Sequence, residues 1–215
     1  MPLIYFIRHA ESIANAGGAT QWPADITLSE RGHAQARALA ASWSQAPSLI
    51  VASPYIRTQL TAQPTRDRFP EAPFEIWPIQ EFTYLNPNNL TGTTAAQRQP
   101  LVEAYWKNAQ PDNIDGPGAE SFNHMLSRIA DVKARLQALD VPVVKVFTHG
   151  QIMGALILQQ LSPKLTPTEM MRAFHSYAAQ HTVHNCSILK AQANPKEFTL
   201  TTQLFHLEDA TTSRH

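Results

Sequence analysis

The sequence has a single cysteine, Cys186, among its 215 residues, so no disulfide can form within the chain. A lone cysteine is typical of a reducing compartment. The longest apolar runs, such as residues 152–158, are far shorter than the ~18–20 residues that a membrane-spanning helix needs. The first residues show neither the basic segment nor the small-residue cleavage site of a secretory signal. We therefore expect a cytoplasmic protein without membrane association.

The chain also lacks net charge, because 17 Lys and Arg residues balance 17 Asp and Glu residues. Without a global positive field the protein is not expected to bind nucleic acid or anionic lipid, and any anion site must be local. Hydrophobic residues make up 43% of the chain and charged residues 16%, a composition that can bury a core. The length favours one large domain.

Short apolar runs alternate with helical patterns along the chain. Strands are expected at 3–7, 48–52 and 143–147, with a weaker strand at 74–79, where Pro78 suits a sheet edge or a strand end. Near the C-terminus, runs at 186–189 and 198–201 flank a turn at 194–196 and predict a hairpin. Helices are expected at 29–43, 121–139 and 151–161. This alternation predicts an α/β domain with a largely parallel sheet.

Residues 83–120 break the alternation, because they contain four prolines: Pro87, Pro100, Pro111 and Pro117. We interpret this segment as an insertion over the sheet rather than a second domain, so that residues 1–215 form one domain. Tyr84 and Trp106 would then lie near the mouth of a site and are candidates for touching a substrate.

Polar residues follow the ends of the predicted strands, which is where ligands bind in open α/β sheets. Arg8-His9, Arg57, His149 and Glu81 each come after a different strand. Two guanidiniums and a histidine form a local pocket for a dianion. Helix N-termini after Ser53-Pro54 and after Gly150 add backbone N–H donors, with Pro54 expected at the first helical position.

This set of residues suits phosphoryl transfer. A neutral imidazole is a nucleophile near pH 7, and flanking arginines favour its neutral form. Glu81 could protonate the departing alkoxide. The scheme requires no metal, and the chain shows no clear carboxylate set for Mg²⁺. His175, His181 and His184 are expected to have surface or supporting roles rather than to bind a metal.

The sequence resembles the Arg-His-Gly branch of the histidine phosphatase superfamily, the phosphoglycerate mutase-like proteins. The resembling blocks occur in family order and span most of the chain: Arg8-His9-Ala10-Glu11-Ser12 with Asn15, Leu28-Ser29-Glu30-Arg31-Gly32, Ser53-Pro54, Arg57-Thr58, Thr61-Ala62, Glu81, Gly118-Ala119-Glu120-Ser121 with Arg128, Thr148-His149-Gly150 and Asn185-Cys186-Ser187. The ordered set is highly specific, whereas a lone Arg-His pair would carry no information.

The resemblance implies a role for each matching residue. His9 would be the nucleophile that becomes phosphohistidine, while Arg8, Arg57 and His149 would bind the phosphate. Asn15 would also contact the phosphoryl group, and Glu81 would be the proton donor, with Glu75 and Glu120 as competing candidates. Ala10 departs from the family's usual glycine. For the fold, we expect a three-layer α/β/α sandwich whose mostly parallel central sheet has an antiparallel edge strand, with a cap insertion.

The expected function is that of a metal-independent phosphatase that hydrolyses small-molecule phosphomonoesters through a phosphohistidine on His9. A phosphoglycerate mutase-type phosphotransferase and a non-catalytic phosphate-binding module remain as alternatives. We expect no cofactor, and a small phosphorylated metabolite as the partner. The sequence leaves the substrate and the oligomeric state open.

Overall fold

A computed structural model describes residues 1–19 and 22–205, and its strands form one six-stranded sheet in the order β3-β2-β4-β1-β5-β6. The first four strands along the chain are mutually parallel: β1 (Leu3–Arg8), β2 (Leu49–Ala52), β3 (Phe74–Ile76) and β4 (Val143–Thr148). The predicted hairpin is present as β5 (Ile188–Asn194), antiparallel to β1, and β6 (Glu197–Phe205), antiparallel to β5. Strand β3 ends before Pro78 and lies at an edge of the sheet, which agrees with the prediction made from this proline.

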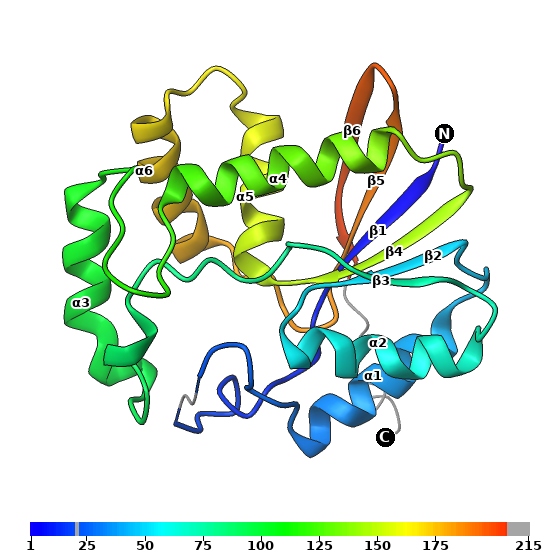
Figure 1. Cartoon of the computed structure of the whole chain (residues 1–215), viewed down its shortest axis with the longest axis horizontal. Coiled ribbons are helices and arrows are strands. Elements are labelled where there is room, and N and C mark those ends of the chain that lie inside the picture. The colour runs from blue at the N-terminus through cyan, green and yellow to red at the C-terminus, as the bar shows by residue number, and fades with distance from the viewer. Residues whose placement is uncertain (20–21, 206–215) are drawn as a thin grey trace, which may run out of the picture.

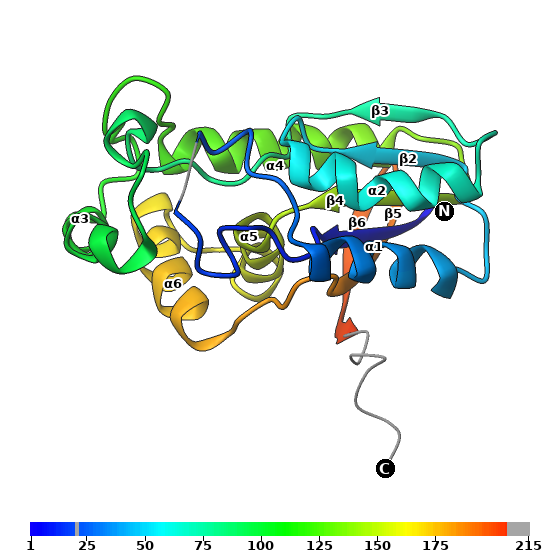
Figure 2. The same cartoon turned by 90° about the horizontal axis from the view of Figure 1, so that it is seen from below.

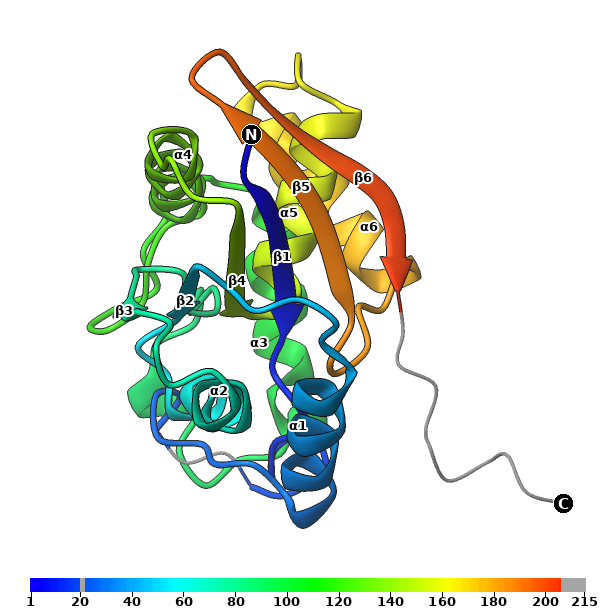
Figure 3. The same cartoon turned by 90° about the vertical axis from the view of Figure 1, so that its right-hand side faces the viewer.

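Helices cover both faces of this sheet (Figures 1 and 3). Helices α1 (Glu30–Ser42) and α2 (Ile56–Arg68) lie on one face, and α4 (Phe122–Gln137) and α5 (Gly150–Leu161) lie on the other. Helix α6 (Pro167–Gln180) packs beside α5, and α3 (Ala95–Asn108) lies beyond the carboxyl ends of the parallel strands (Figure 2). The predicted three-layer α/β/α sandwich is confirmed. That it forms a single domain with 83–120 as an insertion stays a prediction.

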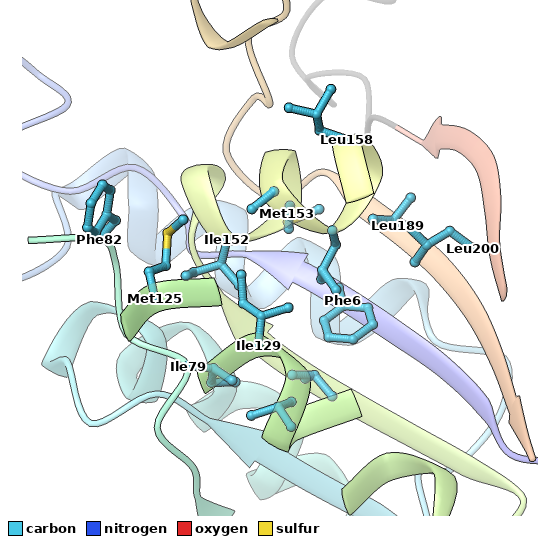
Figure 4. Close-up of a cluster of buried hydrophobic side chains, with 14 of the residues drawn as sticks. Phe6, Ile79, Phe82, Met125, Ile129, Ile152, Met153, Leu158, Leu189 and Leu200 are labelled. Carbon is cyan, nitrogen blue, oxygen red and sulfur yellow. The ribbon is translucent and has the colours of Figure 1, made fainter. Parts of the chain in front are cut away.

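Two separate cores result from the alternation of side chains along the strands. Phe6 points to the side of α4 and α5, where it packs with Ile129, Ile152 and Met153 (Figure 4). The next residue, Ile7, belongs to the opposite core, which contains residues of α1 and α2. The central strands β2 and β4 are buried along their whole length, which explains why they read as uninterrupted apolar runs.

The start of α2 differs from the prediction. The helix begins at Ile56, with Tyr55 as its N-cap, so Pro54 precedes the helix instead of opening it. The reason is a side-chain turn: the Ser53 hydroxyl accepts a hydrogen bond from the Tyr55 amide at 3.2 Å and pairs with the Thr58 hydroxyl at 2.9 Å. Arg57 consequently lies in the first turn of α2.

Two helices were not predicted. Helix α3 lies inside the proline-rich segment and accommodates Pro100, while α6 follows α5. Both begin with a reciprocal capping box, formed by Thr94 with Gln97 and by Thr166 with Glu169. None of the helices in the described part of the chain is long and apolar enough to cross a membrane.

The start of α1 is fixed against the segment that follows His9. The backbone oxygen of Glu11 accepts from the Ser29 amide at 3.0 Å, and the Glu11 carboxylate accepts from the Ser29 hydroxyl at 2.7 Å. A Cβ atom on Gly32 would lie 2.0 Å from that same backbone oxygen, so only glycine permits this approach. Helix α1 therefore holds residues 9–12 at the end of β1.

Candidate active site

The carboxyl ends of three strands bring two histidines and an arginine into direct contact. His9 follows β1, His149 follows β4, and Arg57 reaches back from the first turn of α2. The Arg57 Nε atom donates to His9 Nε2 at 3.2 Å, and Arg57 Nη2 lies 3.1 Å from His149 Nδ1. The two imidazole rings are 5.2 Å apart at their centroids. Residues separated by as many as 140 positions thus meet at one edge of the sheet.

The hydrogen bonds of His9 select one neutral tautomer. Its Nδ1 atom lies 2.7 Å from the Ala10 backbone oxygen, which can only accept, so Nδ1 carries the proton. Its Nε2 atom then keeps a lone pair, which accepts from Arg57. Burial, followed by the charges of Arg57 and Arg8, lowers the pKa of His9 well below its usual 6.5. His9 is therefore uncharged at neutral pH, with the lone pair on Nε2.

Arg57 connects the two histidines of the cluster. Besides its contacts with the two histidines, its Nη1 atom donates to the Pro23 backbone oxygen at 2.6 Å. Burial lowers the pKa of Arg57 to about 10, so the guanidinium remains charged at neutral pH. The side chain is only 6% exposed, which fixes the direction of its donors. Such a buried, oriented cation is suited to a phosphate dianion.

His149 is fully buried and lies behind Arg57. Its Nδ1 atom faces Arg57 Nη2, and its Nε2 atom is 2.7 Å from the Ser53 hydroxyl. Burial and the charge of Arg57 lower the pKa of His149 well below 6.5. His149 contacts Arg57 but does not line the cavity of about 340 Å³ that opens over His9. Its predicted contact with phosphate stays a prediction, whereas its contact with Arg57 is direct.

Arg8, at the end of β1, and Glu81 complete the set of charged residues predicted for the site. Arg8 Nη1 donates to the Val183 backbone oxygen. Glu81 accepts from the Phe82 amide at 3.2 Å and from the Gln151 amide, in the first turn of α5, at 3.4 Å. Burial raises the pKa of Glu81, although the charges of Arg57 and Arg8 oppose this effect. A carboxyl group with a raised pKa is suited to donate a proton.

The backbone before Glu81 is held by a buried ion pair. Arg128 binds the Glu120 carboxylate through two hydrogen bonds, at 2.9 and 2.5 Å. The same guanidinium donates to the backbone oxygens of Pro78 at 2.7 Å and Gln80 at 3.3 Å. The ion pair therefore positions Glu81 without touching the site. Because Glu120 is engaged here, it is not the acid that faces the cavity.

The other competing acid, Glu75, also lies elsewhere. Its carboxylate accepts from the Trp77 indole at 2.7 Å and from Arg135 at 2.6 Å. Neither Glu75 nor Glu120 lines the cavity beside His9, whereas Glu81 does. Geometry thus favours Glu81 among the three carboxyl groups that the sequence offered.

A cavity of about 340 Å³ opens over His9. Arg8, His9, Arg57 and Glu81 are among the residues that line it. Its outer wall comes from residues 83–102 and is mostly apolar or aromatic, comprising Tyr84, Leu85, Leu90 and Val102 with the cation Arg98. Tyr84 lines the cavity, as expected. Trp106 does not, and that prediction was wrong, because its ring packs against Phe122, Phe174 and His175.

A family model for the histidine phosphatase superfamily (branch 1) matches residues 4–203. The chain belongs to this superfamily. A comparison with the curated proteins gives no match. The predicted resemblance is confirmed, and so is the prediction of an enzyme of the phosphatase class, a hydrolase of phosphomonoesters.

Solved structures of other members have the same fold. The α-ribazole phosphatase of Shigella flexneri is 23% identical, with a TM-score of 0.69 over 93% of this chain and 94% of that one. The phosphoserine phosphatase of Entamoeba histolytica, in complex with 3-phosphoglyceric acid, is 20% identical, with a TM-score of 0.71 over 97% and 98%. A mycobacterial glucosyl-3-phosphoglycerate phosphatase is 22% identical, with a TM-score of 0.69 over 94% and 98%.

Asn15 lines the cavity of this histidine phosphatase, near the position that the sequence predicted. Its Oδ1 atom accepts from the Ser12 amide at 3.3 Å and from Asn185 Nδ2 at 3.1 Å. Asn185 Nδ2 also donates to the backbone oxygen of His9 at 2.9 Å. With Oδ1 occupied, Asn15 presents its Nδ2 donors as the group suited to an anion. The role of Asn185 was not predicted. The sequence feature that could have indicated it is the position of Asn185 in the last of the stretches that resemble the family.

Ala10 fits the backbone of this histidine phosphatase without strain. Its amide donates to the Thr61 hydroxyl at 3.0 Å, and its methyl group is fully buried in the core beside α1 and α2. Its φ angle is not positive, since the positive φ values of non-glycine residues in the described chain belong to Ala109 and Cys186. Alanine therefore causes no positive-φ strain at this position, where the family usually has glycine.

Cys186 was predicted inside a strand, and this is wrong. It precedes β5 and has a left-handed backbone with φ of 59°. Its amide donates to the Arg8 backbone oxygen at 3.1 Å, which draws the chain into this turn. Burial raises the pKa of the thiol to about 12, in agreement with an unreactive side chain.

Within residues 1–19 and 22–205, no three His, Cys, Asp or Glu side chains are grouped as metal ligands would be. His175 stacks on Trp106 at 5.1 Å, and His181 stacks on Tyr177 at 4.4 Å. These two histidines thus have aromatic partners, as supporting residues would.

Proposed function

We propose that this histidine phosphatase hydrolyses small-molecule phosphomonoesters through a phosphohistidine on His9, without a metal ion. The observation that carries the proposal is the pairing of His9 Nε2 with Arg57 at the base of a cavity that Glu81 also lines. A nucleophile, an anion-binding cation and an acid of raised pKa are thereby collected around one space.

In the first step the phosphate group of the substrate binds between the guanidiniums of Arg8 and Arg57. Arg57 Nε exchanges its hydrogen bond to His9 Nε2 for one to a phosphate oxygen. The freed lone pair of Nε2 attacks phosphorus, the P–N bond forms, and the bond to the ester oxygen breaks. Glu81 gives its proton to that oxygen, and the alcohol leaves. The two arginines stabilise the charge on the equatorial oxygens of the transition state.

In the second step water attacks the phosphorus of phosphohistidine. Glu81, now a carboxylate, accepts a proton from this water as the P–O bond forms. The P–N bond breaks, its electron pair returns to His9 Nε2, and inorganic phosphate is released. Both His9 and Glu81 regain their starting protonation states, so the cycle balances without a cofactor.

The wall of the cavity favours a substrate with an apolar leaving group. Tyr84, Leu85, Leu90 and Val102 surround the space beyond the phosphate end, and Arg98 is the cation among them. The names of the similar solved structures cite chemically different compounds, so they favour phosphatase chemistry without selecting one substrate. The leaving group is therefore best identified by experiment.

A panel of phosphorylated metabolites tests the proposed reaction. We expect phosphate release from p-nitrophenyl phosphate and from some of the metabolites, with activity unchanged by EDTA, and an acid-labile phosphoenzyme after rapid quenching. Release that requires an added metal would contradict the metal-independent chemistry. A phosphoenzyme that passes its phosphate only to a phosphoglycerate would identify a mutase, and no phosphoenzyme at all would identify a binding module.

The pH dependence of kcat/KM should be bell-shaped. Activity falls as the pH drops through the pKa of His9, which is lowered below 6.5, because protonated imidazole has no lone pair for attack. Activity also falls as the pH rises through the pKa of Glu81, which is raised above 4.5, because the carboxylate has no proton to donate. The optimum should lie between these two pKa values, and a pH series on one substrate measures both limbs.

Substitution of Glu81 should remove the alkaline limb of the pH profile. For Glu81→Gln, we expect a loss of about 10²–10³-fold with alkyl phosphates and a flat alkaline side. The loss with p-nitrophenyl phosphate should be smaller, because p-nitrophenolate leaves without protonation. Glu75→Gln, outside the cavity, is the matched control and should leave the profile unchanged. An alkaline limb that persists in Glu81→Gln would assign it to another group.

A further inference from the structure

A second cavity, of about 260 Å³, lies behind the active site between α5 and α6. Arg8, Glu81 and Gln151 line both this cavity and the one over His9. The remaining residues of the two linings differ, so these three side chains form the wall between the two spaces. The second cavity thus reaches the acid Glu81 through residues that do not otherwise line the substrate cavity.

The shared wall contains polar atoms that suit water. Arg8 Nε and Gln151 Oε1 are buried and have no hydrogen-bond partner among the described residues. Buried polar atoms are normally satisfied, and ordered water is the usual partner where protein supplies none. A cavity of about 260 Å³ has room for several waters at about 30 Å³ each.

The second cavity opens to solvent at its other end. Ala178, His181 and Thr182 line it and are exposed, at the end of α6 and in the segment that follows. Solvent can therefore enter beside α6, and the path from this opening to Glu81 does not cross the cavity that would hold the substrate.

A glycine in the middle of α5 keeps this space open. Gly154 lines the cavity, although glycine destabilises a helix interior by about 1 kcal/mol relative to alanine. A Cβ atom there would contact only the rings of Phe174 and Tyr177, at 3.8 Å, which is ordinary packing. Alanine therefore fits, whereas a larger side chain would extend into the cavity.

From these features we propose that the second cavity is the entry path of the water that hydrolyses phosphohistidine. The inference rests on the proposed function. The attacking water must come to the side of phosphorus opposite to His9, where Glu81 accepts its proton. The released alcohol leaves through the substrate cavity, and water from the second cavity can then take the position beside Glu81 that the alcohol oxygen has vacated. Water is thereby favoured over an alcohol as the acceptor of the phosphoryl group.

The test blocks the path without touching the catalytic groups. Gly154→Leu should fill the cavity, and Gly154→Ala is the matched control. Because a core substitution can disturb folding, Ala178→Phe offers a second block at the exposed rim of α6. Its matched control is Ala179→Phe, the next residue of α6, which is also exposed but lies outside the cavity lining.

The readout separates the two chemical steps. The enzyme is labelled with ³²P-phosphate from substrate, and decay of the phosphoenzyme is followed after a chase with unlabelled substrate. We expect decay to slow about tenfold in both blocked variants, as one hindered step would give, while the rate of phosphoenzyme formation is retained. Glycerol added as an acceptor should take a larger share of the phosphoryl group in these variants than in the wild type.

Two results would overturn the water path. Decay as fast as in the control variants would show that water arrives through the substrate cavity. An equal fall in formation and decay would show that the cavity only supports Arg8 and Glu81. Failure of the proposed function looks different, since the wild-type enzyme itself would then form no phosphoenzyme on His9.

Discussion

His9→Ala is expected to lower the hydrolysis of phosphomonoesters by about 10⁴-fold or more, because the substitution removes the imidazole that lines the cavity beside Arg57. In the described chain, the other imidazole of the cluster, His149, is fully buried behind Arg57 and does not line the cavity. It cannot replace His9 without moving the guanidinium. The loss should appear in kcat, with p-nitrophenyl phosphate as well as with metabolites, since leaving-group quality does not supply a nucleophile.

Two controls separate this chemistry from damage to the fold. His33→Ala removes an exposed histidine of α1 and should leave kcat unchanged. Added imidazole should restore part of the activity of His9→Ala, because the substitution leaves space beside Arg57 for a free ring. Acid-quenched His9→Ala should carry no ³²P. A labelled variant, or one with more than a tenth of the wild-type kcat, would assign the covalent step to a different residue.

The placement of these site residues was predictable because it depends on topology more than on packing. Parallel strands have their carboxyl ends at one edge, so residues that follow the strands had to lie near one another. Arg8, His9 and Arg57 follow this rule directly. The rule does not specify which side chain faces the cavity and which is buried beneath it. It therefore could not place His149 behind Arg57. That arrangement depends on the Ser53 hydroxyl, which holds His149 Nε2.

The outer parts of the site were less predictable, since the local signals conflict. Four prolines argued against helix in residues 83–120, yet the Thr94–Gln97 capping box starts α3 there and its geometry accommodates Pro100. Aromatic residues in this segment could face either the cavity or the core. Tyr84 faces the cavity, while Trp106 packs among Phe122 and Phe174, because α6 supplies partners that the sequence did not reveal.

The groups that position Glu81 could not be derived from the sequence. Arg128 and Glu120 are eight residues apart, and their pairing alone would indicate a surface ion pair. The structure buries Arg128, and its guanidinium also holds the backbone oxygens of Pro78 and Gln80. Such long-range contacts depend on how a loop crosses a helix, which neither periodicity nor spacing specifies.

Arg57→Ala is expected to lower kcat/KM by about 10³-fold, comparable to or greater than the loss of one donor to a transition-state oxyanion. It removes a buried charge and the hydrogen bonds to His9 and His149. The pH profile should also change. The charge of Arg57 lowers the pKa of His9, so without it that pKa rises and the acidic limb moves to higher pH. A residue with a purely structural role would lower activity without this shift.

Arg57→Lys distinguishes charge from geometry. Lysine retains the positive charge, so the acidic limb should stay closer to its wild-type position. It has no fork with which to reach His9, His149 and the Pro23 oxygen together, so a loss of about 10²-fold should remain. Arg66→Ala, also on α2 but outside the cavity, is the matched control and should change neither quantity. If Arg57→Ala left the acidic limb in place, the low pKa of His9 would result from burial and Arg8 alone, and Arg57 would act only on the phosphate.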